Sequence, residues 1–183
     1  MPSSSRSASS RSRPRPRKRS APRLTHVGAD GASRMVDVSA KPVTRRTAVA
    51  RGRIVIAASA MRLARAGRLP KGAVTEVARV AGVLAAKRTA EAIPLCHPLS
   101  LEHVAVTLTP RRDGFEIEAT VVTVGRTGAE MEALHAVAVA GLTLYDMMKA
   151  ADRGMVLTDV RLIRKTGGAR GDYEAPAARK VHS

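Results

Sequence analysis

The chain has 183 residues and carries 32 Lys and Arg against 15 Asp and Glu, a formal net charge of +17; 44% of its residues are apolar. This length favours one domain with tails, and the apolar content suffices for a core. No apolar run approaches the roughly 20 residues that a membrane-spanning helix needs, and the single cysteine rules out an intramolecular disulfide. Both features indicate a cytoplasmic protein in a reducing compartment.

The positive charge is unevenly distributed along the chain. Residues 1–23 form a Ser/Arg/Pro-rich stretch with no acidic side chain, which predicts a disordered tail because there is little to bury. The folded body is expected over residues 24–173, with a second short tail over 174–183, and its charge favours anionic ligands, phosphates above all. The rival class is a small nucleic-acid-binding protein whose tail contacts phosphates. The scarcity of aromatic side chains, on which bases stack, argues against it.

Hydrophobic periodicity and helix-breaking residues predict a mixture of strands and helices in the body. In chain order these are a strand over 47–57, helices over 58–66 and 72–92, two hairpin strands around 104–108 and 115–121, a helix over 130–151, a strand over 156–164 and a flexible loop over 165–172. The second helix has apolar side chains at helical spacing, Val77 and Leu84 among them, and Pro94 ends it. Because strands and helices alternate irregularly around one antiparallel hairpin, the class is α+β, with helices packed on one face of the sheet.

The helix predicted over 130–151 is rich in Ala and Gly, and residues 127–130 before it form a capping-box pattern. Small side chains allow such a helix to pack closely against a sheet on one side and against a second helix on the other. In a body of this size the second helix can come from another subunit, which favours an oligomer.

Asp146 and Lys149 are neighbours on one face of this helix, beside apolar residues that predict partial burial. The pair fits either an ordinary ion pair or an acid/base pair tuned by desolvation, and spacing does not separate the two. His97 follows Cys96 between two prolines that restrict its orientation. This setting fits either a structural or a catalytic role for the histidine. No cluster with metal-ligand spacing accompanies them, so no metal site is predicted.

Two glutamates occupy the start of the same helix. Glu130 is most simply the capping partner of Thr127, whereas Glu132 is expected to face a ligand or solvent. The 14 residues from Glu132 to Asp146 span about 21 Å of helix. Because one compact pocket cannot use both ends of one helix, either the two groups have separate roles or two subunits bring opposite ends of two such helices together. We favour the second interpretation.

Two basic loops fit either solvated turns or mobile clamps for phosphates. Residues 68–72 precede the second helix and contain Lys71, and residues 165–172 combine Lys165 with three glycines. The second loop is not a Walker A motif, because its lysine precedes the glycines.

Several motifs become specific through their order along the chain. They lie at residues 24–26, 35–41, 71–72, 85–89, 93–99, 127–134, 144–150 and 165–168. In sequence and spacing these stretches resemble the cyclic pyranopterin monophosphate synthases, a family of molybdenum cofactor (molybdopterin) biosynthesis. The resemblance covers residues 24 to about 173, and the stretches around His97 and Asp146 are together its most specific part.

The resemblance implies a ferredoxin-like α+β fold and a homohexamer, a trimer of dimers with active sites between subunits. It implies a lyase that converts (8S)-3′,8-cyclo-7,8-dihydroguanosine 5′-triphosphate into cyclic pyranopterin monophosphate and pyrophosphate. No cofactor is implied, except that Mg²⁺ can accompany the triphosphate. The alternative is an inactive relative that acts as a scaffold. Against it, all the matched ionisable positions hold chemically competent residues.

The same resemblance suggests roles for individual residues. It makes Asp146 and Lys149 the acid/base pair and adds Lys71 as a catalytic lysine. The residues expected to bind substrate are Leu95, Cys96, His97, Arg126, Met131, Glu132 and Lys165. Arg126 stands where the family commonly has Lys, and residues 169–170 replace a Lys-Ser pair. Both departures keep positive charge, although Arg is not a geometric copy of Lys.

Overall fold

A computed structural model of the chain describes residues 31–66, 73–169 and 171–176. Its elements are β1 (Thr44–Val55), α1 (Ala58–Arg65), α2 (Val74–Lys87), α3 (Thr89–Ala92), β2 (Leu101–Arg111), β3 (Gly114–Gly125), α4 (Glu130–Met148), β4 (Val156–Thr166) and β5 (Tyr173–Glu174). The predicted tail over 1–23 and the predicted catalytic Lys71 lie outside the described residues. The short strand β5 crosses the predicted start of the C-terminal tail.

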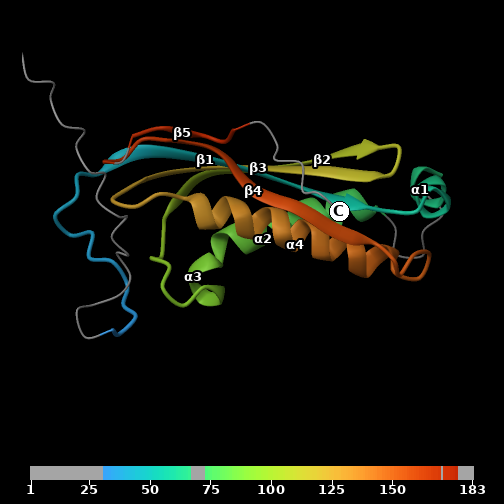
Figure 1. Cartoon of the computed structure of the whole chain (residues 1–183), viewed down its shortest axis with the longest axis horizontal. Coiled ribbons are helices and arrows are strands. Elements are labelled where there is room, and N and C mark those ends of the chain that lie inside the picture. The colour runs from blue at the N-terminus through green and yellow to red at the C-terminus, as the bar shows by residue number, and fades with distance from the viewer. Residues whose placement is uncertain (1–30, 67–72, 170, 177–183) are drawn as a thin grey trace, which may run out of the picture.

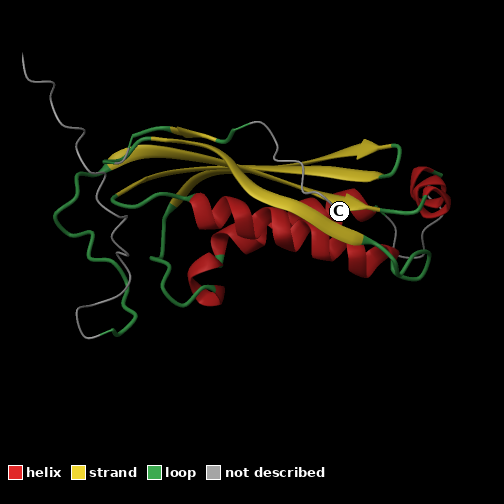
Figure 2. Cartoon of the chain, in the orientation of Figure 1, coloured by secondary structure: helices red, strands yellow, loops and turns green. Residues whose placement is uncertain are grey.

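The five strands form one antiparallel sheet in the order β2-β3-β1-β4-β5. Helices α2 and α4 lie together on one side of this sheet (Figures 1 and 2). The predicted α+β class is therefore confirmed. From β1 to β4 the elements follow the order of the split βαβ motif, and the ferredoxin-like assignment stays a prediction.

The predicted hairpin is formed by β2 and β3, which pair from Leu101↔Thr123 to Arg111↔Gly114. Gly114 at the turn has a φ of 142°, a backbone conformation that residues with a side chain rarely adopt. An added Cβ there would also collide with the carbonyl oxygen of Ile54 on β1. The turn therefore needs glycine both for its own conformation and for the approach of the neighbouring strand.

The helix predicted over 72–92 is divided into α2 and α3 at Arg88. The buried face of α2 also differs from the predicted apolar stripe, because Val77 and Leu84 are 47% and 45% exposed. The buried face instead consists mainly of small residues, and an added Cβ at Gly82 would lie 2.9 Å from the carbonyl oxygen of Ala136 on α4. Only a small side chain allows the two helices to approach this closely.

Helix α4 packs against the sheet and α2 through small residues on opposite sides. An added Cβ at Gly52 of β1 would lie 2.6 Å from Val137 Cγ1, and one at Gly141 would lie 2.5 Å from Leu157 Cδ1 on β4. The close packing predicted for this helix is thus observed, but its second partner is α2 of the same chain. None of the described helices is long and apolar enough to span a membrane.

The capping box predicted over 127–130 is wrong. The N-cap of α4 is Ala129, which offers no capping side chain, and Glu130 is the first helical residue. The helix also ends earlier than expected, at Met148. Glu130 is available for another partner, described below.

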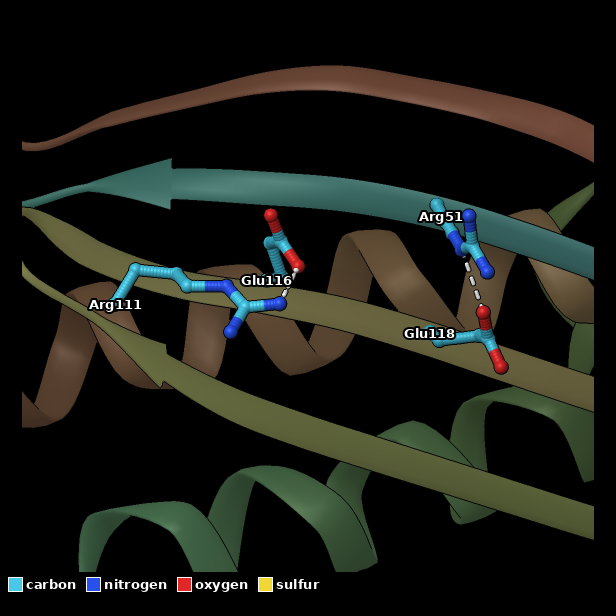
Figure 3. A network of polar contacts seen from close by, with 4 residues as sticks. All are labelled: Arg51, Arg111, Glu116 and Glu118. Carbon is cyan, nitrogen blue, oxygen red and sulfur yellow. Dashed lines mark hydrogen bonds and ion pairs between the residues drawn. The ribbon is translucent and has the colours of Figure 1, made fainter.

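The face of the sheet opposite the helices carries cross-strand ion pairs (Figure 3). Arg51 Nε lies 2.5 Å from Glu118 Oε2, and Arg111 Nη2 lies 2.5 Å from Glu116 Oε2. Arg51 and Glu118 are directly opposite in the β1–β3 register. Exposed pairs of this kind contribute little to stability because solvent screens them, so they support the register while the buried face supplies most of the stability.

We expect Gly114→Ala to lower the free energy of unfolding by at least about 2 kcal/mol, because alanine is strained at this φ and its Cβ meets the Ile54 backbone. Chemical denaturation measures the loss. Gly125→Ala at the other end of β3 is the matched control, since the nearest atom to an added Cβ is Thr123 Oγ1 at 3.7 Å. Equal losses for the two variants would contradict this account of the turn.

Candidate active site

A cavity of about 290 Å³ lies where β1 and α4 begin and β4 ends. Segments that are far apart in the sequence contribute to its wall. Its lining residues are Val36, Val38, Lys41, Arg46, Leu95, Cys96, His97, Leu99, Arg126, Thr127, Gly128, Glu130, Met131, Glu132, Lys165, Gly167, Gly168 and Ala169. The seven residues expected to bind substrate are all among them. Four of the lining side chains are Lys or Arg, so the cavity favours an anionic ligand.

His97 is oriented by the segment that precedes β1. Its Nε2 lies 2.8 Å from the carbonyl oxygen of Val36. Because a carbonyl oxygen only accepts, Nε2 carries the hydrogen, and the neutral ring keeps Nδ1 as an acceptor. The contact therefore fixes both the ring orientation and its tautomer.

Arg126, between β3 and α4, holds the same segment near the cavity. Its Nη1 donates to the carbonyl oxygens of Ser39 and Lys41, the latter at 2.7 Å. Both acceptors are uncharged, so the guanidinium keeps its positive charge at the rim of the cavity. This part of the wall depends on a contact between residues more than 80 positions apart.

Lys165 lies in strand β4 rather than in a flexible loop as predicted. It pairs with Ala48 of β1 in the sheet register. Its Nζ lies 3.0 Å from Glu130 Oε1, and both side chains are less than one-third exposed. Glu130 at the start of α4 is therefore the partner of this lysine and not of Thr127.

Glu132 lines the cavity and is only 4% exposed. The pKa of its carboxyl is raised to about 7, mainly by burial and to a smaller extent by the charge of Glu130, while a backbone hydrogen bond opposes the shift. Burial also raises the pKa of the Cys96 thiol, with a smaller contribution from Glu132. Near neutral pH, the cavity thus contains a carboxyl that changes readily between its acid and base forms.

Asp146 and Lys149 lie at the opposite end of α4 and do not line this cavity. Lys149 Nζ is 2.8 Å from Asp146 Oδ1, which confirms the pairing. The predicted partial burial is wrong for the isolated chain, because the two side chains are 55% and 56% exposed.

Among the described residues no group of three His, Cys, Asp or Glu side chains could hold a metal ion.

Arg46 is a cavity residue that the sequence reasoning missed. It is 8% exposed and lies on β1, which begins three residues earlier than predicted. With the strand start correctly placed, period-two alternation puts it on the same face as Ala48 and Ala50 of the core. The sequence signal for a buried Arg46 was its position two and four residues before alanines on the core face of the same strand.

The chain is similar to one family model and to curated proteins that carry a single name. A model described as the MoaC family matches residues 35–168. A curated protein of Parvibaculum lavamentivorans named cyclic pyranopterin monophosphate synthase is 55% identical over 157 residues, 85% of this chain and 98% of the relative. Proteins of the same name from Streptomyces coelicolor and Thermomicrobium roseum are 55% and 58% identical, each over 82% of this chain and over 89% and 92% of the relative.

Glu132→Gln is expected to change how stability depends on pH. The folded-state pKa of about 7 exceeds the ordinary value of 4.5, so the wild type loses stability as pH rises through this window, because folding then requires a buried charge. The variant should lack this loss and be more stable at pH 8 by on the order of 3 kcal/mol. Denaturation at pH 8 measures the difference, and the same comparison at pH 4.5 is the control. A difference that does not vary with pH would contradict the burial argument.

Proposed function

Because the chain belongs to the MoaC family, we propose that it is a cyclic pyranopterin monophosphate synthase. Its substrate is (8S)-3′,8-cyclo-7,8-dihydroguanosine 5′-triphosphate, and its products are cyclic pyranopterin monophosphate and pyrophosphate. The observation that carries the proposal is the cavity itself. All seven residues expected to bind substrate, from segments far apart in the sequence, line one small pocket rich in basic side chains.

The products define what the site must do. A cyclic monophosphate forms when a substrate hydroxyl passes its proton to a base in the site and its oxygen bonds to the α-phosphorus, while the bond from that phosphorus to the bridging oxygen breaks. The departing pyrophosphate then gains negative charge, which fixed positive groups stabilise. Lys165, Lys71 and Arg126 are assigned to this task. Mg²⁺ can travel with the triphosphate as part of the substrate.

The ring chemistry needs groups that hold and move protons. His97 presents a fixed tautomer at the cavity, and Glu132 has a pKa of about 7 there. Both are suited to orient the base and the sugar through hydrogen bonds. Asp146 and Lys149 are assigned to proton transfer while the purine-derived ring opens and recloses as a pterin.

The position of this acid/base pair supports a site shared between subunits. Glu132 and Asp146 are separated by about 21 Å along α4, so one chain cannot bring both to one ligand. Apolar side chains also remain on the outer surface of the helix layer, where Val77, Val80 and Leu142 are 47%, 48% and 59% exposed. Exposed apolar surface of this kind fits a protein–protein contact. We propose the homohexamer, a trimer of dimers, that the family resemblance implies, and a cytoplasmic location for the enzyme.

The proposed activity is tested by incubating the protein with the cyclised dihydro-GTP and measuring pyrophosphate and pterin. Lys149→Ala and Asp146→Asn should each lower kcat by about 100-fold or more, because each removes a proton-transfer group. Arg51→Ala, which removes a cation from the opposite face of the sheet, should retain activity. Absence of turnover by the wild type would overturn the proposed function. Full activity of the two variants would overturn only their roles.

Mixing two inactive variants tests whether the site is shared. His97→Ala disables the cavity, and Lys149→Ala disables the other end of α4. If each site takes its two halves from different subunits, a mixed dimer contains one intact site, and random mixing should restore about a quarter of wild-type activity. The two variants are unfolded and refolded together so that their subunits assort, and size-exclusion chromatography checks that the refolded mixture assembles. A mixture that assembles and stays inactive would contradict a shared site.

A further inference from the structure

The pair of Asp146 and Lys149 lies where α4 gives way to a loop. The helix ends at Met148, and the backbone N–H of Lys149, its C-cap, donates to the carbonyl oxygen of Tyr145 at 2.9 Å. Residues 149–155 then connect α4 to β4. Because both side chains of the pair are more than half exposed, packing alone does not fix them. Their position therefore depends on how the backbone of the last helical turn and of this loop is held.

The carboxylate of Asp152 holds the loop near its middle. Its Oδ1 accepts the backbone N–H of Gly154 at 2.8 Å, and its Oδ2 accepts that of Ala57 at 2.8 Å. The first contact shapes the loop, and the second ties it to the N-cap of α1, 95 residues earlier in the chain. Helix α1 and the loop lie at the same end of the molecule (Figure 1). Because α1 has no acidic residue in its first turn and no capping side chain, this carboxylate is also the negative charge that complements the helix dipole.

Tyr145 attaches the same loop to the side of α4. Its hydroxyl donates to the carbonyl oxygen of Arg153 at 3.0 Å, while its ring packs against the hydrophobic core. The backbone N–H groups of Ala151 and Asp152 both donate to the carbonyl oxygen of Met148, at 2.8 and 3.1 Å. The loop is thus bonded to the helix at one edge and to α1 at the other. The last turn of α4 cannot shift without breaking these contacts.

We propose that Asp152 is a positioning residue for the pair of Asp146 and Lys149, and that Tyr145 assists it. This inference rests on the proposed function, because it concerns the pair assigned to proton transfer there. Asp152 acts through the backbone of the loop that begins at Lys149, and not on the substrate itself. A misplacement of about 1 Å can slow a reaction by about 100-fold. Loosening the loop should therefore slow proton transfer, while the cavity at the other end of α4 keeps its affinity for substrate.

The test is steady-state kinetics of the full chain with the cyclised dihydro-GTP. Asp152→Asn keeps the size of the side chain but replaces one of its two acceptor oxygens with an amide donor. It should lower kcat by about tenfold or more and leave KM within about twofold. Asp113→Asn is the matched control, because the Asp113 carboxylate pairs with Arg53 in the region of the β2–β3 turn and not with this loop. It should leave both kcat and KM within about twofold.

A double variant separates positioning from a general loss of structure. If Asp152 acts through Lys149, then adding Asp152→Asn to Lys149→Ala should lower the residual kcat by less than about twofold. Losses that multiply in the double variant would overturn the inference. A folded Asp152→Asn variant with the kcat of the wild type would overturn it as well.

Thermal melting shows whether Asp152→Asn is folded. If it is not, Tyr145→Phe replaces it in the same assays, because this change keeps the ring and removes only the hydrogen bond to Arg153. It should lower kcat by about fivefold with KM unchanged, and wild-type kcat in this variant would overturn the inference. A wild type without turnover overturns the proposed function, whereas turnover that neither variant lowers overturns only the role of the loop.

Discussion

The close packing of α4 is the constraint on which the rest of the molecule depends. At Gly52 of β1, Gly82 of α2 and Gly141 of α4, an added Cβ would lie within 2.9 Å of a neighbouring atom. These contacts hold the helix against the sheet on one side and against α2 on the other. The core has almost no aromatic side chains to fill wider gaps, so small residues and short distances supply its packing density. The position of the helix axis fixes where both of its ends lie.

The two ends of α4 have different electrostatic environments. The N-terminal end brings two carboxyl groups to the cavity, where Glu130 meets a lysine and Glu132 is buried. When two neighbouring carboxyl groups lie in contrasting environments, their pKa values differ, so one can be protonated while the other is ionised at the same pH. The C-terminal end carries the exposed pair of Asp146 and Lys149. A rigid helix of this length keeps the two sets apart within one chain, which is why the proposed chemistry needs a second copy.

Local patterns in the sequence were enough to predict most elements and their class. The Asp-Gly turn between two alternating apolar runs identified the hairpin of β2 and β3, because its signal lies within a few residues. Prolines and glycines located the ends of α1 and of the α2–α3 segment. The order of motifs indicated the family, and helix geometry alone separated Glu132 from Asp146. The element bounds were less accurate, and the missed start of β1 left Arg46 outside the predicted strand.

Only the tertiary structure decided which groups are buried and which are paired. The apolar spacing of α2 did not reveal that its small residues, rather than Val77 and Leu84, face the core, because that choice depends on how closely α4 approaches. The capping pattern did not reveal that Glu130 pairs with Lys165, which is 35 residues away in the sequence. The sequence by itself thus determined the local periodicity of apolar and polar residues, and with it most helices and strands. Burial, pKa and charge pairing were decided by contacts between distant segments, which only the folded chain brings together.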